Sequence, residues 1–127
     1  MPSVPVSSLD AEFGAVSEFW SPRVIAAANG QYVKIARVSG ELVWHAHRDE
    51  DEFFLCRRGV FGLRFRDGSE VRLRPGEFHV VPKGVEHLPF TVGGEAEVLF
   101  VEPAATTHTG DIVTERTRSI ESQIAHL

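Results

Sequence analysis

Apolar and polar residues alternate in short runs through the middle of the chain, and glycines and prolines separate these runs. Phe61, Leu63 and Phe65 alternate with small or charged neighbours, which is the period of a half-buried β-strand. Asp67-Gly68 follows as a hairpin signal, and a second alternating run returns from it. The pattern predicts eight strands, at residues 31–38, 41–47, 52–57, 61–66, 71–74, 78–81, 85–92 and 95–102. Many short strands with regular turns favour an all-β sandwich or barrel.

The two ends of the chain carry helical patterns. Residues 8–13 predict a short helix, with Ser8 as its N-cap and two acidic residues in its first turn. Ile120 and Ile124 have helical spacing near the C-terminus. We therefore expect a single domain with short helical or irregular extensions. Its expected parts are a barrel core at about 31–102, an N-terminal extension at 1–30 and a C-terminal tail at 103–127 of the 127 residues.

The composition limits the class of protein and its partners. Thirteen Lys and Arg residues against eighteen Asp and Glu residues give a formal net charge of −5, which disfavours a nucleic-acid partner. No apolar run is long enough to cross a bilayer, and the N-terminus lacks a signal-peptide pattern. The single cysteine, Cys56, cannot form a disulfide within the chain, which fits a reducing compartment. We therefore expect a cytoplasmic protein that binds neither nucleic acid nor membranes.

Six histidines in so short a chain raise the question of a metal site, because histidine is the commonest metal ligand. His45 and His47 are two residues apart, so both imidazoles face the same side of a strand. Glu52 begins the next predicted strand after a tight acidic turn, and His87 lies on another strand. The other acidic residues of this turn are expected to face water, and Asp51 is the alternative ligand. A lone His-x-His pair is more often a surface or core feature than a metal site, so the interpretation depends on the complete set.

Three imidazoles and one carboxylate that meet inside a barrel would bind a divalent transition metal. This mixture of nitrogen and oxygen ligands suits Fe(II), Mn(II), Ni(II), Cu(II) or Zn(II) and selects little among them. Four protein ligands on an octahedral ion leave two positions open for water, dioxygen or a chelating substrate.

The same residues belong to two motifs that resemble those of the cupin superfamily. The matching positions are His45, His47, Glu52 and Gly59 in the first motif, and Gly76, Pro82, Gly84 and His87 in the second. The sequence departs from the family pattern at two places. Four residues rather than five separate Gly40 from the first histidine, and Thr91 stands where the family often has Asn. Neither departure affects a ligand position of the family.

The resemblance covers residues 40–91 by motif and about 31–102 by strand pattern. It implies a double-stranded β-helix, also called a jelly roll, with a metal ion near one mouth of the barrel. It also implies that the ligands of this ion are His45, His47, Glu52 and His87.

Four further residues are candidates for lining the pocket of such a barrel, namely Phe54, Cys56, His79 and Phe90. Packing is the default role of the two phenylalanines, and an inward cysteine such as Cys56 is more often a small hydrophobic residue than a reactive thiol. His79 either orients a ligand through a hydrogen bond or is a half-exposed strand residue. His108 and His126 lie in the C-terminal tail and are expected to be solvated or at a subunit contact.

Five arginines lie on neighbouring predicted strands: Arg57, Arg64, Arg66, Arg72 and Arg74. They either attract an anionic substrate or form a solvated outer face with acids such as Asp67 and Glu70. Exposed charges of this kind contribute little energy, which favours the solvated face.

Two functions remain open, because a fold alone does not define a function. The first is a small metalloenzyme that acts on a small oxygenated or anionic molecule by dioxygenase-type or isomerase-type chemistry. The alternative is a non-catalytic cupin that binds a small ligand and keeps the metal for structure. Open coordination positions favour the enzyme, although no separate catalytic residue can be named. We also predict a homodimer, with Phe13, Phe19 and Trp20 of the N-terminal segment covering the partner.

Overall fold

The fold is that of an antiparallel β-protein with two short helices. The structure is a computed structural model and describes residues 5–110 and 112–127. Its elements, in chain order, are α1 (Leu9–Gly14), β1 (Arg23–Ala28), β2 (Gln31–Glu41), β3 (Glu52–Arg58), β4 (Phe61–Phe65), β5 (Glu70–Leu73), β6 (Phe78–Val81), β7 (His87–Pro103) and α2 (Ile120–Ile124). No helix in the described part of the chain is long and apolar enough to cross a membrane.

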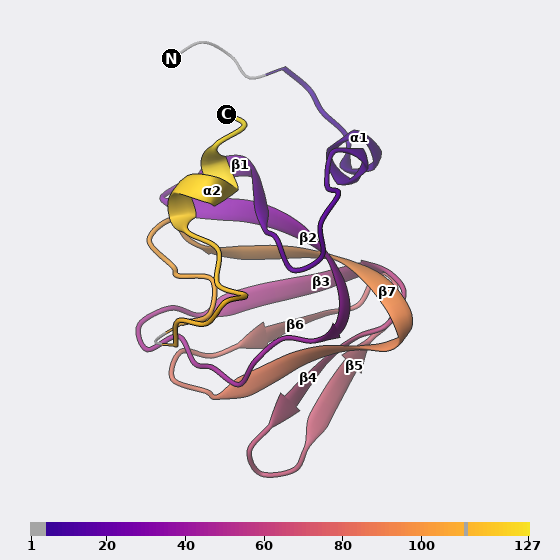
Figure 1. Cartoon of the computed structure of the whole chain (residues 1–127), viewed down its shortest axis with the longest axis vertical. Helices are drawn as coiled ribbons and strands as arrows, with labels where there is room; N and C mark the ends of the chain where they lie inside the picture. The colour runs from indigo at the N-terminus through magenta and orange to yellow at the C-terminus, as the bar shows by residue number, and fades with distance from the viewer. Residues whose placement is uncertain (1–4, 111) are drawn as a thin grey trace.

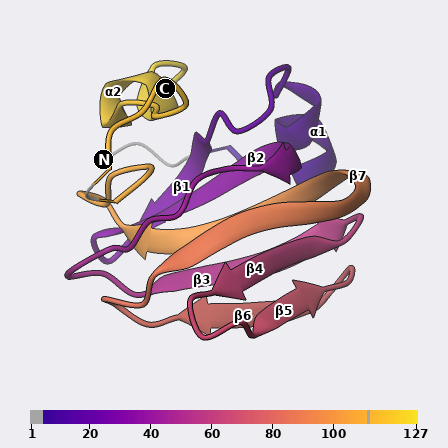
Figure 2. The same ribbon diagram turned by 60° about the horizontal axis from the view of Figure 1, so that its bottom comes forward.

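The long strand β7 organises the sheet. The strands follow the order β1, β2, β7, β3 and β6, and β4 pairs with both β7 and β5 (Figure 2). The first part of β7, from His87 to Thr91, pairs with β4. Its second part, from Glu97 to Val101, lies between β2 and β3. Because one bent strand serves both parts of the sheet, the sheet curls into the expected jelly-roll barrel.

The strands differ most from the sequence pattern at three places. β2 continues through Gly40 to Glu41 with a shift of register, so the predicted end at residue 38 is wrong. The predicted strand 41–47 is also wrong, because past Glu41 only His45 forms a β-bridge. Residues 85–92 and 95–102 were expected as two strands, but β7 runs through the glycine pair between them. These glycines, Gly93 and Gly94, have positive φ angles of 76° and 117°, which let the strand bend without ending.

β1 is a strand that the pattern did not predict. It forms a hairpin with β2, and the two strands are joined by Asn29-Gly30. Both turn residues have positive φ, 52° and 76°, as a two-residue type I′ turn requires. Part of the N-terminal extension therefore joins the sheet.

Buried residues with even numbers on β2, β3 and the second part of β7 face the barrel interior. These are Lys34, Ala36 and Val38 on β2, Glu52, Phe54 and Cys56 on β3, and Ala96, Val98, Phe100 and Glu102 on β7. The apolar members form one core cluster with residues of β4, β5 and β6. The charged members gather at one end, where β3 begins and β7 ends. The interior is therefore apolar along most of its length and polar at one mouth.

Helix α1 covers the outer face of β2 and β7. Ser8 caps the helix as predicted, since its side chain accepts a hydrogen bond from the Ala11 N–H at 3.1 Å. Phe13 is 2 % exposed and packs with Ile35 in a second, smaller apolar cluster. Phe13 and Trp20 are thus buried in the chain's own core, so the predicted use of these two side chains to cover a partner is wrong. Phe19, at 48 % exposed, remains at the surface.

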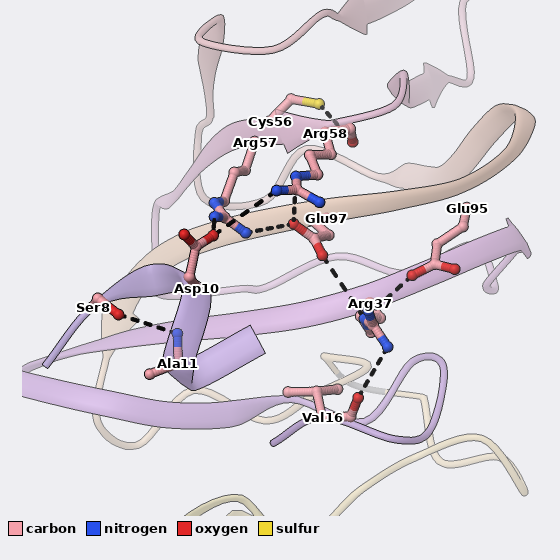
Figure 3. A network of polar contacts seen from close by, with 10 residues as sticks. All are labelled: Ser8, Asp10, Ala11, Val16, Arg37, Cys56, Arg57, Arg58, Glu95 and Glu97. Carbon is pink, nitrogen blue, oxygen red and sulfur yellow. Dashed lines mark hydrogen bonds and ion pairs between the residues drawn. The ribbon is translucent and has the colours of Figure 1, made fainter. Parts of the chain in front are cut away.

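A network of ion pairs holds α1 in place (Figure 3). Arg57 of β3 pairs with Asp10 of the helix and, at 2.7 Å, with Glu97 of β7. Arg37 of β2 lies 3.8 Å from Glu97 and donates a hydrogen bond to the Val16 carbonyl. Of the other arginines expected on the outer face, Arg64 is half-buried, Arg66 and Arg72 are exposed, and all three pair with glutamates.

The C-terminal segment (residues 104–127) returns over the barrel from the end of β7 and finishes in α2. It passes beside the loop that joins β2 to β3, and α2 lies against β1 (Figure 1). The ring of His126 donates a hydrogen bond from Nε2 to the Val24 carbonyl at 2.7 Å. The contact of Gly110 with Ala46 is so close that a Cβ atom at Gly110 would lie 2.0 Å from the Ala46 carbonyl oxygen. The segment is therefore packed on the barrel and on the loop that carries two of the candidate ligands.

Candidate metal centre

Four side chains that could bind a metal converge at the polar mouth of the barrel. One ligand atom from each of His45, His47, Glu52 and His87 lies within 4.8 Å of every other. All four residues are buried, with exposed fractions of 3 %, 4 %, 4 % and 0 %. Two ligands of one zinc-sized ion lie at most about 4.2 Å apart, since each bond is about 2.1 Å long. The four atoms are therefore close enough to bind a single ion after small movements.

Backbone hydrogen bonds bring the histidines together. His45 and His87 form an antiparallel bridge, with N–H to carbonyl distances of 3.0 Å and 2.9 Å in the two directions. The carbonyl of His47 accepts a hydrogen bond of 2.7 Å from the Gly84 N–H. Gly84 belongs to the turn before His87 and has a φ of 79°, which favours glycine. This turn therefore holds the loop of His45 and His47 against the strand of His87.

The carboxylate of the cluster comes from the first residue of β3. Glu52 is paired in register with Val81 of β6, and its side chain faces inward with that of Phe54. Asp51 points to the other side, where its carboxylate accepts a hydrogen bond from the Lys83 N–H at 2.8 Å. Asp51 is exposed and lies outside the cluster, so the alternative ligand is not brought to the site.

Two of the rings are fixed in the tautomer that a metal requires. Nδ1 of His45 lies 2.8 Å from the Val43 carbonyl, and Nδ1 of His87 lies 2.9 Å from the Val85 carbonyl. A carbonyl oxygen can only accept, so Nδ1 carries the proton in both rings. The lone pair of Nε2 is then free to bind an ion, and the hydrogen bond on the far side fixes the ring orientation.

The remaining atoms of the cluster have no hydrogen-bond partner among the described residues. His47 Nε2 lies 3.1 Å from Glu52 Oε1, and His87 Nε2 lies 3.5 Å from the same oxygen. All three atoms are buried, yet none has hydrogen-bond geometry to another group. Buried polar atoms are normally satisfied, and several that face a common point suit a shared cation. The donor set therefore fits a divalent transition metal, and the fit rests on the buried atoms themselves.

The electrostatics of the cluster agree with this fit. Burial and the neighbouring His87 lower the pKa of His45 to about 4, which keeps this ring neutral near pH 7. Burial also disfavours the charged form of His47, but the Glu52 carboxylate outweighs it and raises the pKa of this ring. Burial opposes ionisation of Glu52, whereas the close polar groups of Glu102, His47 and His87 outweigh it and hold the pKa of Glu52 well below the usual value. The site therefore presents an ionised carboxylate to any cation that it holds.

A buried polar chain lies behind Glu52. Glu102 of β7 is 1 % exposed, and burial together with the Glu52 charge raises its pKa well above the usual value. This direction favours the protonated form of the Glu102 carboxyl beside the Glu52 carboxylate. Lys34 Nζ lies 2.7 Å from Glu102 Oε1 and donates a hydrogen bond to Gln123 Oε1 at 2.5 Å. These contacts orient Glu52 from behind, as hydrogen-bonded neighbours commonly do for metal-binding carboxylates.

A small cavity opens beside the cluster. Its volume is about 40 Å³, and its polar lining comes from His45, Glu52 and His108. The rest of the wall is mostly apolar and includes Trp20, Pro22, Val38, Leu42, Phe54, Phe61, Pro89 and Phe100. The Trp20 backbone has a φ of 56°, and its Nε1–H donates to the Ser39 carbonyl at 2.9 Å. A tryptophan held in this conformation gives the cavity a rigid aromatic side.

The four pocket candidates have different positions. Phe54 lines the cavity, whereas Cys56, His79 and Phe90 do not. Cys56 is fully buried in the core, and burial raises the pKa of its thiol, so a reactive thiolate is disfavoured. His79 is half-buried on β6 with its ring near Phe65. The Phe90 ring packs against Gly62, where a Cβ atom would lie 2.2 Å from the ring.

Several residues of the site were not singled out by the sequence patterns. Lys34 and Glu102 belong to the buried chain, and alternation alone would have placed both on the inner face with Glu52. His108 lines the cavity and is half-buried, so the expected solvated position is wrong, and the alternative of a subunit contact stays a prediction. No local signal marks His108, because its position depends on how the C-terminal segment folds back.

The fold and the site together define a jelly-roll barrel with a three-histidine, one-glutamate ligand set at one mouth. Comparison with known families agrees, since a family model described as a cupin domain matches residues 32–102. This match covers more than half of the chain, and the chain therefore belongs to the cupin family.

One solved cupin structure supports this assignment, and two further proteins are similar to the chain. A cupin-2 domain protein from Shewanella frigidimarina is 41 % identical, with a TM-score of 0.74 over 77 % of this chain and 94 % of that chain. Protein NMB1881 from Neisseria meningitidis is 27 % identical, with a TM-score of 0.71 over 78 % of this chain and 99 % of that chain. The uncharacterised protein YdbB of Bacillus subtilis is 33 % identical over 63 residues, which are 50 % of this chain and 56 % of that protein. The match thus spans little more than half the length of this curated relative.

Proposed function

We propose that His45, His47, Glu52 and His87 hold one divalent transition metal ion, and that a small oxygenated molecule binds beside it. The observation that supports this proposal is the set of buried ligand atoms that face one another without hydrogen-bond partners among the described residues. Such a set is costly to bury unless a cation satisfies it. The polar neighbours behind Glu52 are consistent with a carboxylate that is held for this purpose.

The metal would supply a Lewis acid and, if it is redox-active, a route to dioxygen chemistry. The chain's own residues supply the rest of the site. Trp20, Leu42 and Phe54 form an apolar wall that excludes water and packs against the hydrocarbon part of a ligand. A cavity of about 40 Å³ holds only a few water-sized groups, so the ligand is small or the mouth widens around it.

We further propose that the protein is a metal-dependent enzyme of the dioxygenase or isomerase type. Four protein ligands leave two positions of a six-coordinate ion free, which is what a reacting substrate needs. The identity of the native metal separates the two chemistries, because zinc does not change oxidation state and would exclude dioxygen activation by the metal. A homodimer and a cytoplasmic location stay predictions, and light scattering of the purified protein would test the first.

The metal site is tested by the metal content of the purified protein. The variant H45A/H47A should lose the bound metal, whereas H79A/H126A, which also removes two imidazoles, should retain one equivalent. Elemental analysis after gel filtration gives both values. Equal trace amounts in the two variants would overturn the site.

The reaction is tested on the loaded protein. Dioxygen consumption is measured after anaerobic loading with Fe(II), with diketones, catechols and oxalate as substrates, and sugar isomerisation is measured with Mn(II), Ni(II) or Zn(II). Turnover that H45A/H47A lacks would support the enzyme. Ligand binding without turnover under every metal would instead favour the non-catalytic alternative.

A further inference from the structure

The C-terminal segment contributes a histidine to the metal cavity. His108 lies in the cavity wall with His45 and Glu52, although it comes after the last strand of the barrel. Two neighbours of His108, Thr106 and Thr109, are fully buried, so this part of the segment is packed rather than loosely attached. The contact between Gly110 and the Ala46 carbonyl described above places the same loop directly on the ligand-bearing residues 45–47.

The backbone around His108 fixes the state of its ring. Nδ1 accepts a hydrogen bond of 2.9 Å from the Arg118 N–H, and a backbone N–H can only donate. The proton of the neutral ring is therefore on Nε2. Burial, with the positive charges of Lys34 and Arg118, lowers the pKa of His108 to about 4, so the ring is neutral near pH 7. Nε2–H has no hydrogen-bond partner among the described residues and is left as a donor for the cavity.

A buried glutamine connects this segment with the polar chain behind Glu52. Gln123 of α2 is 1 % exposed and donates from Nε2 to the Arg118 carbonyl at 3.2 Å. Its Oε1 accepts the bond of 2.5 Å from Lys34, which in turn contacts Glu102. The segment that presents His108 is therefore held by the same buried contacts that orient the Glu52 carboxylate.

We propose that His108 is a ligand-positioning residue, which donates a hydrogen bond from Nε2–H to an acceptor atom of the small molecule bound in the metal cavity. The proposal rests on the proposed function, because it assumes a ligand at the metal. It deepens that function by defining the ligand class: the molecule carries a donor atom for the metal and a second, adjacent acceptor. Small anions and molecules with neighbouring oxygen atoms have this arrangement.

The test uses Co(II) as a spectroscopic metal and azide as the small anion. Azide titrations are followed by the visible absorption of Co(II) in the unsubstituted protein and in three variants: H108L, H108Q and H79L. The leucine removes the donor, the glutamine amide retains an N–H donor, and His79 is a half-buried histidine away from the cavity. Circular dichroism confirms that each variant is folded.

We expect all four proteins to bind one equivalent of Co(II). The Kd of azide should rise about tenfold in H108L, which corresponds to one hydrogen bond of ordinary strength. It should recover in part in H108Q and stay unchanged in H79L. A merely structural role of His108 would not produce recovery by an amide donor.

Other outcomes overturn the proposal in distinguishable ways. Unchanged azide affinity in H108L would show that the ring does not reach the bound anion. Loss of Co(II) in H108L, with retention in H79L, would make His108 a metal ligand instead. Failure of the unsubstituted protein to bind Co(II) would overturn the proposed function itself, and this proposal with it.

Discussion

Replacement of Lys34 by methionine tests the buried polar chain most directly. The substitution keeps an unbranched side chain of similar length and removes the ammonium group. Lys34 is 1 % exposed, and its ammonium contacts Glu102 and Gln123. The variant therefore leaves the Glu52–Glu102 carboxyl pair with its negative charge but without the buried cation that faces it.

The expected loss of stability is large. The Glu52–Glu102 pair carries one negative charge, which attracts the Lys34 ammonium that lies 2.7 Å from Glu102 Oε1. Part of this attraction offsets the cost of burying the ions, and removal of one partner of a buried pair typically costs about 3–5 kcal/mol. Lys34→Met should therefore lower the unfolding free energy by about 3–5 kcal/mol and the melting temperature by about 10–15 °C.

The second lysine of the chain provides a matched control. Lys83 is exposed, and the structure gives its side chain no contact among the described residues. Lys83→Met makes the same chemical change and should alter the unfolding free energy by less than about 0.5 kcal/mol. Urea denaturation of both variants, with a chelator present so that no metal contributes, gives the two values on one scale.

The comparison has a clear negative outcome. If Lys34→Met and Lys83→Met change the unfolding free energy by the same small amount, the buried ion pair contributes no net stability and the reasoning is wrong. An unfolding curve of Lys34→Met with a lower slope would instead indicate a changed native or denatured state, and its free energy would then not be compared directly.

Three other substitutions test separate parts of the structure. In metal-free protein, the lowered pKa of His45, about 4 against an unfolded value of 6.5, means that the unfolded chain binds more protons between these pH values. The unfolding free energy should therefore fall by up to about 3 kcal/mol as the pH drops from 6.5 to about 4. In His45→Gln this fall should be absent, and denaturation curves recorded at both pH values measure it. Gly110→Ala brings a Cβ atom against Ala46 and should lower both the melting temperature and the metal affinity. Gly68→Ala is the control, because Gly68 also has a positive φ but lies in open space, and this variant should lower only the melting temperature. Arg57→Met removes the ion pairs to Asp10 of α1 and Glu97 of β7 and should cost about 1–2 kcal/mol, with faster proteolysis of that helix.

Most of the barrel could be predicted from the sequence, because its strands are short, show alternating apolar and polar residues, and are separated by strong turn signals. The strand 78–81 and the inward face of β3 agree with the pattern, as do Ser8 as a helix cap and the barrel class. The missed strand β1 had a signal in Asn29-Gly30, a dipeptide that favours two-residue hairpins. The split of β7 was wrong because the glycine pair was interpreted as a turn, whereas glycine also allows a continuous strand to bend.

The site was only partly accessible from sequence, for a physical reason. The motif spacing brings His45, His47, Glu52 and His87 to one place because it encodes the turns between them. His108 has no such spacing, since a long loop places it in the cavity wall. The raised pKa of Glu102 depends on burial and on a neighbouring charge, and both exist only in the folded chain.

The bridge between His45 and His87 has a consequence for the order of events. Its two backbone hydrogen bonds need no ion, and they join segments that are far apart in the chain. The barrel must therefore close before the ligand set is complete, and the metal-free protein should already be folded, unlike a zinc finger. Folding then does not discriminate among metals. Which ion occupies the centre is decided by the metals available to the finished barrel and by how fast each one leaves.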